Sequence, residues 1–124
     1  MKIIDAHIRQ LADNNNQILI LPNKDGFDLI RSYDISYIVA ARAYCTLHFY
    51  NGNSLLVSKP LKEIESQLLK KRFFRVHNSY LVNICSIHKV IKNDGEMLEL
   101  HDGKHIPLAQ RRREAFFRFV ATRK

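Results

Sequence analysis

The sequence predicts a mostly β, antiparallel fold with two helices. Short apolar runs recur at hairpin spacing, Asp-Gly pairs stand between several of them, and two segments carry the apolar stripe of an amphipathic helix. With 124 residues and 46% hydrophobic content, the chain is long enough to bury a core and too short for two domains. We therefore expect one globular domain over residues 17–124, preceded by a short segment over residues 1–16.

The first elements are a helical or linker segment and a hairpin. In residues 1–16 the apolar residues fall near helical spacing until three asparagines end the pattern, which predicts a short amphipathic helix or the tail of a linker. Residues 18–21 and 27–30 are apolar runs. The loop between them predicts a hairpin with Asp25 and Gly26 at its turn.

Three more strands are expected before the first long helix. Residues 35–41 and 44–50 have strand character, and apolar residues alternate with more polar ones in the second run, as in a strand with one buried face. An Asn-Gly-Asn turn then leads into residues 54–58. Residues 60–71 predict a helix of roughly three turns, with proline in the first turn and two lysines whose charges suit the C-terminus.

The C-terminal part predicts three strands and a second helix. Residues 84–91, 97–100 and 104–107 are expected to be strands, separated by tight turns at two Asp-Gly pairs. The final helix is predicted from an apolar stripe with basic residues outside it. The stripe consists of Ala115, Phe116, Phe119 and Val120, and the residues outside it are Arg112, Arg113 and Arg118.

Residues 73–83, FFRVHNSYLVN, are the segment most informative about function. Aromatic and aliphatic residues surround a polar centre, which predicts a buried strand that breaks into a turn and then resumes. Core residues on both sides should hold such a turn rigidly. It suits recognition of another molecule, because Asn78 can pair two hydrogen bonds with an adenine edge, while Arg75 and Ser79 can satisfy phosphate oxygens.

The net charge favours a polyanionic partner. The formal net charge is +8 and the sequence pI is about 9.7, which for a small domain points most commonly to nucleic acid, less often to an anionic membrane face, and otherwise to solubility alone. The basic residues form two groups that flank the polar turn. The groups are Lys59, Lys62, Lys70, Lys71, Arg72 and Arg75, and then Arg111, Arg112, Arg113 and Arg118.

Catalysis and metal binding are not predicted. The sequence lacks the nucleophile elbow, the phosphate-binding loop and the zinc-protease motif, and nothing supplies His77 with a nucleophile or an orienting acid, so we expect no enzyme activity. His101, Asp102 and His105 suggest a metal site, but no cysteine or carboxylate cluster completes the converging ligands that a metal needs. No metal or other cofactor is expected.

Cysteine usage and hydropathy indicate the compartment. Cys45 and Cys85 are far apart and lie in apolar alternating runs, so both are expected to be buried free thiols in a reducing cytoplasm. No apolar run approaches the length of a bilayer span, and the N-terminus lacks the core of a signal peptide. The sequence thus predicts a soluble, cytoplasmic protein without a membrane partner.

Five segments, taken in order, carry a resemblance to a known family. They are LPNKDGFDLI, DISYIVAARAYCTLHF, NGNSLLVSKPLKEIESQL, FFRVHNSYLVNICSIHKV and DGKHIPLAQRRREAF. Together they cover about residues 18–120, and this part of the chain resembles the LytTR DNA-binding domain. That domain is the output module of many bacterial response regulators and also occurs in stand-alone regulators.

The resemblance implies an elongated antiparallel β-sheet sandwich of LytTR type, with one intervening α-helix and a short C-terminal helix. It also implies that loops enter successive major grooves of DNA and bend the duplex. Carried over by position, the loops fall on residues 42–44, on residues 77–79 with Asn78 at the base-reading position, and on Gln110 and Arg111. With neighbouring basic residues, the candidate DNA-binding set is Arg42, Tyr44, Lys59, Arg75, His77, Asn78, Ser79, Gln110, Arg111 and Arg112.

The expected function is sequence-specific binding of double-stranded DNA by a bacterial transcription regulator, at paired direct repeats that the resemblance implies. Residues 1–16 are too few to hold a receiver domain, so two readings stay open. The chain is either a stand-alone regulator or the C-terminal part of a longer response regulator in a histidine-kinase pathway. The alternative function is a basic interaction module that binds RNA, an acidic protein or a membrane surface without DNA sequence specificity.

Overall fold

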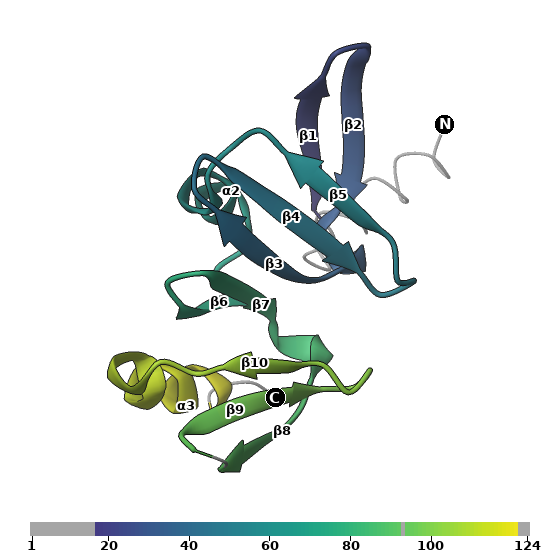
Figure 1. The fold of residues 1–124 in the computed structure, drawn as a ribbon. Helices are drawn as coiled ribbons and strands as arrows, with labels where there is room; N and C mark the ends of the chain where they lie inside the picture. Colours follow the sequence, from purple (N-terminus) through teal and green to yellow (C-terminus); the bar gives the residue numbers. More distant parts are fainter. Residues whose placement is uncertain (1–16, 93, 122–124) are drawn as a thin grey trace, which may run out of the picture.

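The computed structural model describes residues 17–92 and 94–121, and the helix or linker predicted over residues 1–16 lies outside them. The described residues are mostly β, as predicted, and their strands form three antiparallel sheets (Figure 1). The elements are β1 (Ile18–Asn23), β2 (Gly26–Arg31), η1 (Ser32–Asp34), β3 (Ile35–Ala41), β4 (Tyr44–Phe49), β5 (Ser54–Val57), α2 (Leu61–Gln67), β6 (Phe73–His77), β7 (Tyr80–Asn83), η2 (Ile84–Ser86), β8 (Ile87–Lys92), β9 (Glu96–Leu100), β10 (His105–Pro107), η3 (Gln110–Arg112) and α3 (Arg113–Ala121).

The hairpin of β1 and β2 has its turn one residue earlier than predicted. Asn23 pairs with Gly26, so the turn residues are Lys24 and Asp25, and the prediction of Asp25 and Gly26 is wrong. The Asn23 side chain favours this position, because its Oδ1 accepts a hydrogen bond from the Asp25 N–H at 2.8 Å. Gly26 follows with φ +151°, a conformation that residues with a side chain rarely adopt.

The five-stranded sheet lies at the centre of the molecule, in the order β5-β4-β3-β7-β6. β3 pairs with both β4 and β7, while β5 and β6 form the two edges. This arrangement confirms the predicted strands at residues 35–41 and 44–50. It also confirms that residues 73–83 form a strand, a turn and a second strand.

Helix α2 is shorter than predicted. It covers Leu61–Gln67, and Pro60 stands just before it at the N-cap. Leu68 leaves the helical conformation, with φ −92° and ψ 153°, and its side chain is buried in the core. The prediction that Lys70 and Lys71 lie at the helix C-terminus is therefore wrong, because the burial of Leu68 requires the chain to turn earlier.

Strand β8 also begins later than predicted. The 3₁₀ turn η2 occupies Ile84–Ser86 and precedes the strand. The buried side chain of Asn83 favours this turn. It accepts a hydrogen bond from the Cys85 N–H at 3.0 Å and donates one to the Ile35 carbonyl at 2.9 Å.

The two cysteines have different environments, although both are free thiols. Cys45 is fully buried, and burial raises the pKa of its thiol to about 11. Cys85 is exposed, and its Sγ accepts a hydrogen bond from the Arg72 guanidinium at 3.2 Å. The prediction of two buried cysteines is wrong for Cys85, because the η2 turn takes it out of the strand alternation.

Helix α3 covers Arg113–Ala121 and follows η3 directly. Phe116 is its buried anchor, as predicted, and two other members of the predicted stripe are partly buried. Ala115 is exposed instead, and Phe117 packs against the core. Arg112 was predicted on the polar side of this helix but lies before it, in η3, where it is partly buried against β6.

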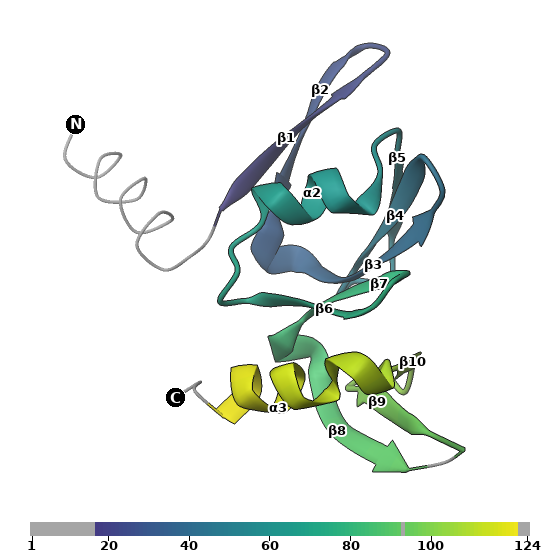
Figure 2. The same ribbon diagram turned by 90° about the vertical axis from the view of Figure 1, so that its left-hand side faces the viewer.

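Two hydrophobic cores lie on opposite faces of the five-stranded sheet, with α2 and the hairpin on one face and α3 and the three-stranded sheet on the other (Figure 2). Alternate residues of β3 divide between them, with Ile38 in the first core and Tyr37 in the second. This layering confirms the predicted sandwich with one intervening helix and a C-terminal helix.

Candidate nucleic-acid interface

The topology of the five-stranded sheet brings several chain turns to one end. In antiparallel pairs the end of one strand lies beside the start of the next. The β3–β4 turn at residues 42–43, the β6–β7 turn at residues 78–79 and the end of β5 therefore share one end of the sheet. The Ala40 N–H donates to the Ser79 carbonyl at 2.8 Å, which ties the first two turns together. In Figure 1 the arrowhead of β3 and the start of α3 both lie on the left-hand side.

Six of the ten predicted site residues lie at this end of the sheet. Arg42 and Tyr44 are exposed in and after the β3–β4 turn, where Arg42 adopts a left-handed backbone with φ 60°. Lys59 follows β5, and its ammonium lies 2.7 Å from the Glu63 carboxylate. The six residues are Arg42, Tyr44, Lys59, His77, Asn78 and Ser79.

The β6–β7 turn is braced by the core, as the sequence predicts. Val76 and Leu81, on either side of it, are completely buried. Within the turn, the Ser79 N–H donates to Nδ1 of His77 at 3.0 Å. In the neutral imidazole this bond assigns the proton to Nε2, which can therefore donate to a partner.

Arg75 holds the turn from its inner side. Its guanidinium donates to the His77 carbonyl at 3.2 Å and to the Asn78 carbonyl at 2.6 Å, and it pairs with the Glu65 carboxylate at 2.6 Å. The Arg75 side chain is only 19% exposed. Among the described residues, these contacts of Arg75 position other protein groups. Glu65 belongs to the candidate site, although sequence analysis missed it.

Asn78 joins the second predicted loop to the third. Its side-chain Oδ1 accepts hydrogen bonds from Arg111 at 2.9 Å and from Arg112 at 3.2 Å. The Ala109 N–H donates to the Val76 carbonyl at 2.9 Å, which anchors η3 beside β6. Residues separated by more than thirty positions in the sequence therefore converge on one exposed amide.

The convergence concentrates positive charge. Arg112 also donates to the Arg75 carbonyl at 3.3 Å. Burial, followed by the positive charges of Arg111 and Arg75, lowers the pKa of the Arg112 guanidinium. An anion placed among these guanidinium groups would offset their mutual repulsion.

The remaining C-terminal residues lie at the margin of this surface. Gln110 is exposed in η3. Arg113 is engaged elsewhere, because its Nε lies 2.5 Å from the Glu96 carboxylate and its guanidinium lies 4.9 Å from the Phe117 ring centroid. Arg111 and Arg112 are thus the two members of the arginine cluster that contact Asn78.

His101 and His105, the two histidines considered for a metal site, have different neighbours, and the His101 ring centroid lies 5.3 Å from that of His88. His105 lies 3.2 Å from the Glu99 carboxylate, and across residues 17–92 and 94–121 no group of three or more His, Cys, Asp or Glu side chains is arranged to hold a metal ion.

Of the helices in the described part of the chain, none combines the length and the hydropathy that crossing a bilayer would need.

Comparisons with known proteins agree on one family. The model of the LytTr DNA-binding domain matches residues 25–120. An uncharacterized response regulatory protein of Vibrio cholerae is 29% identical over 86 residues, which cover 66% of this chain and 33% of that protein. The chain thus spans about a third of the length of the curated relative it matches.

A solved structure has the same fold. It is the LytTr DNA-binding domain of a protein described as a methyl-accepting/DNA response regulator from Bacillus cereus. The TM-score is 0.70 at 21% sequence identity, and the match covers 83% of this chain and 95% of that one.

Proposed function

Because the chain belongs to the LytTR family of DNA-binding domains, we propose that it binds double-stranded DNA at specific sites and regulates transcription. The family is a DNA-binding family and not an enzyme family. The proposed role is therefore recognition without catalysis, as the output module of a response-regulator pathway.

The observation that carries this proposal is the convergence of Arg111 and Arg112 on the Asn78 amide. An asparagine amide can form paired hydrogen bonds with the N6 and N7 positions of adenine in the major groove. In the free protein the Asn78 Oδ1 accepts hydrogen bonds from both guanidinium groups. We infer that on DNA the two guanidinium groups move to phosphate oxygens, which frees Oδ1 to accept from adenine N6 while Nδ2 donates to N7.

The neighbouring cations are suited to phosphate. Arg111 and Arg112 present planar guanidinium groups, which bind phosphate oxygens in a bidentate manner. Arg42 and Lys59 lie at the same end of the sheet, on the far side of the β3–β7 pair. We propose that they contact the backbone of the duplex, while the turns at residues 42–44 and 77–79 enter major grooves.

The number of copies on DNA and the upstream pathway are proposed from the size of the surface and from the family resemblance. The surface is small, and a single module buries about 600–1,000 Å² of protein on DNA. Tight binding is therefore expected to need two copies on paired direct repeats, which raise avidity without new contacts in either site. A receiver domain or histidine-kinase pathway would act upstream of this module.

The test is selection of bound sequences from a random duplex pool, followed by competition. Enrichment of one sequence, and its resistance to excess unrelated duplex, would support specific DNA recognition. The alternative function is tested with three further competitors of the bound duplex. They are vesicles of phosphatidylcholine with anionic phosphatidylserine, an unrelated RNA and an acidic peptide. If no sequence is enriched, and if any of these competitors displaces the bound duplex as efficiently as unlabelled DNA does, the protein is a general polyanion-binding module.

A further inference from the structure

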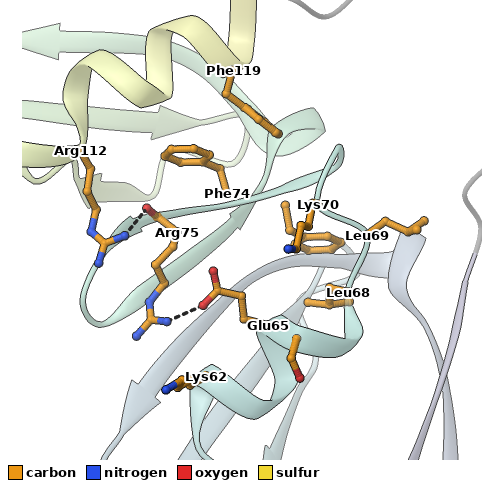
Figure 3. Close-up of a pocket in the computed structure, with 11 residues that line it drawn as sticks. Lys62, Glu65, Leu68, Leu69, Lys70, Phe74, Arg75, Arg112 and Phe119 are labelled. Carbon is orange, nitrogen blue, oxygen red and sulfur yellow. Dashed lines mark hydrogen bonds and ion pairs between the residues drawn. The ribbon is translucent and has the colours of Figure 1, made fainter.

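A cavity of about 530 Å³ lies beside β6, between α2 and α3 (Figure 3). Small-molecule sites in proteins typically measure about 300–1,000 Å³. DNA recognition by the exposed turns makes no use of this space. Its lining combines an apolar wall with a group of cations, and that combination is specific enough to indicate a class of ligand.

The apolar wall comes from two parts of the chain that are far apart in sequence. Phe74 of β6 and Phe119 of α3 face each other there, with ring centroids 5.0 Å apart. Leu69, between α2 and β6, also lines the space. An aliphatic or aromatic group placed against these side chains would be removed from water, at a gain of roughly 25 cal/mol per Å² of apolar surface.

The polar part of the lining is strongly cationic. Four basic side chains contribute to it, from Lys62, Lys70, Arg75 and Arg112, against the single carboxylate of Glu65. Glu65 neutralises Arg75 at 2.6 Å. Arg112 Nε is buried and has no hydrogen-bond partner within the described residues, so one donor of this guanidinium is left unsatisfied beside the cavity.

We propose that this cavity binds a small amphiphilic anion, whose apolar body packs on Phe74 and Phe119 and whose carboxylate or similar anionic group lies between Arg75 and Arg112. The two guanidinium groups offer paired donors to such a group. The duplex itself is not the proposed occupant, because the aromatic wall offers nothing to a phosphodiester.

The same two arginines connect the cavity to the predicted DNA-reading turn. Arg75 donates to the Asn78 carbonyl, and Arg112 donates to the Asn78 side chain. An anion that recruits these guanidinium groups withdraws them from Asn78 and adds negative charge beside the DNA surface. The ligand therefore weakens DNA binding, and by linkage DNA weakens ligand binding by the same factor. This regulatory part rests on the proposed function, whereas the existence of the site does not.

The first experiment uses the protein alone, without DNA. ¹⁵N-labelled protein is titrated with 4-phenylbutyrate and, separately, with 4-phenylbutan-1-ol, which has the same apolar body and no charge. We expect saturable shifts of the Leu69, Lys70 and Phe119 amides, and at least tenfold tighter binding of the carboxylate. Equal affinity of the two compounds, or shifts confined to the exposed apolar residues Phe27 and Leu29 of the hairpin, would overturn the proposal.

Three variants sharpen the result. Lys70→Glu should weaken phenylbutyrate binding at least fivefold, whereas Lys24→Glu, the same charge change in the hairpin turn, should leave it unchanged. Glu65→Gln should strengthen binding of the carboxylate and not of the alcohol, because it frees Arg75 from its internal partner. Equal effects of Lys70→Glu and Lys24→Glu would show that binding depends only on the net charge of the protein, and this result would overturn the proposed site.

The second experiment measures DNA binding by fluorescence anisotropy at saturating phenylbutyrate. A loss of affinity of about fivefold or more, within the usual range of allosteric coupling, is expected. Unchanged affinity would overturn the regulatory part and leave the cavity site standing. If the protein binds no DNA at all, the proposed function fails, and the DNA-free titration still decides the site.

Discussion

Replacing Arg75 by lysine should destabilise the β6–β7 turn while keeping its charge. The guanidinium bonds the carbonyls of His77 and Asn78 and the carboxylate of Glu65 at once. A lysine ammonium is a point charge without the planar fork and cannot hold all three partners. Losing one charge-assisted hydrogen bond at this partly exposed site should lower the free energy of unfolding by about 1.5 kcal/mol. For a domain of this size that corresponds to about 4–7 °C in Tm.

The same substitution should reduce discrimination between DNA sequences. A misplaced Asn78 loses part of a base contact that contributes about 1–3 kcal/mol, so the ratio of specific to random affinity should fall about fivefold. The salt dependence of binding should not change, because lysine keeps the charge and Arg75 faces protein groups. Thermal unfolding and fluorescence anisotropy at several salt concentrations measure both effects, with Arg118→Lys as a control at an exposed arginine of α3.

One pattern of results would refute this reasoning. If Arg75→Lys keeps the wild-type Tm and specificity while Arg75→Ala makes the salt-dependence slope shallower by about one unit, Arg75 contacts a DNA phosphate. Its hydrogen bonds to the turn would then be incidental to recognition.

Three further predictions concern other parts of the protein. Alanine at Arg111 or Arg112 should weaken binding to all duplexes alike and lower the salt-dependence slope by about one unit. Arg113→Ala should leave the slope unchanged, because Arg113 pairs with Glu96. Identical slopes for all three variants would contradict this prediction. The free protein should sediment as a monomer, and it should bind a tandem DNA site much more tightly than a single site. A stable dimer without DNA, or tandem binding no stronger than two independent binding events, would contradict pairing on DNA. Iodoacetamide at pH 8 should modify the exposed Cys85 and spare Cys45, because Cys45 is buried and the pKa of its thiol is about 11. Mass spectrometry that detects alkylated Cys45 in folded protein would contradict its assignment as buried.

The strands and hairpins were predictable from local sequence, and the ends of elements were not. Alternation and turn residues are local signals, so residues 35–41, 44–50 and 73–83 were assigned correctly. The end of α2 depends on Leu68, whose apolar side chain suits a continued helix as well as a chain that turns into the core. Cys85 was misassigned for a similar reason. The alternating pattern continues through it, but the Asn83 side chain forms a turn there.

The location of the candidate site was predictable, but its internal contacts were not. The polar turn around Asn78 is visible in the sequence because core residues bracket it. The contacts from Arg111 and Arg112 to Asn78 span 33 and 34 positions in the sequence. A local sequence pattern cannot predict a contact between residues so far apart in the chain. Glu65 was missed because a carboxylate on a helix surface has no signal that distinguishes an internal partner from a solvated charge.

The most direct test of base reading by the β6–β7 turn is Asn78→Ala, measured on a selected duplex and on a random duplex under the same salt conditions. Asn23→Ala, in the hairpin turn, is the matched control. Specific affinity should fall by about 1–3 kcal/mol, or about 5- to 150-fold. Affinity for the random duplex should change less than about twofold, because the phosphate contacts that supply nonspecific binding remain. Equal losses on the two duplexes would show that Asn78 does not read a base.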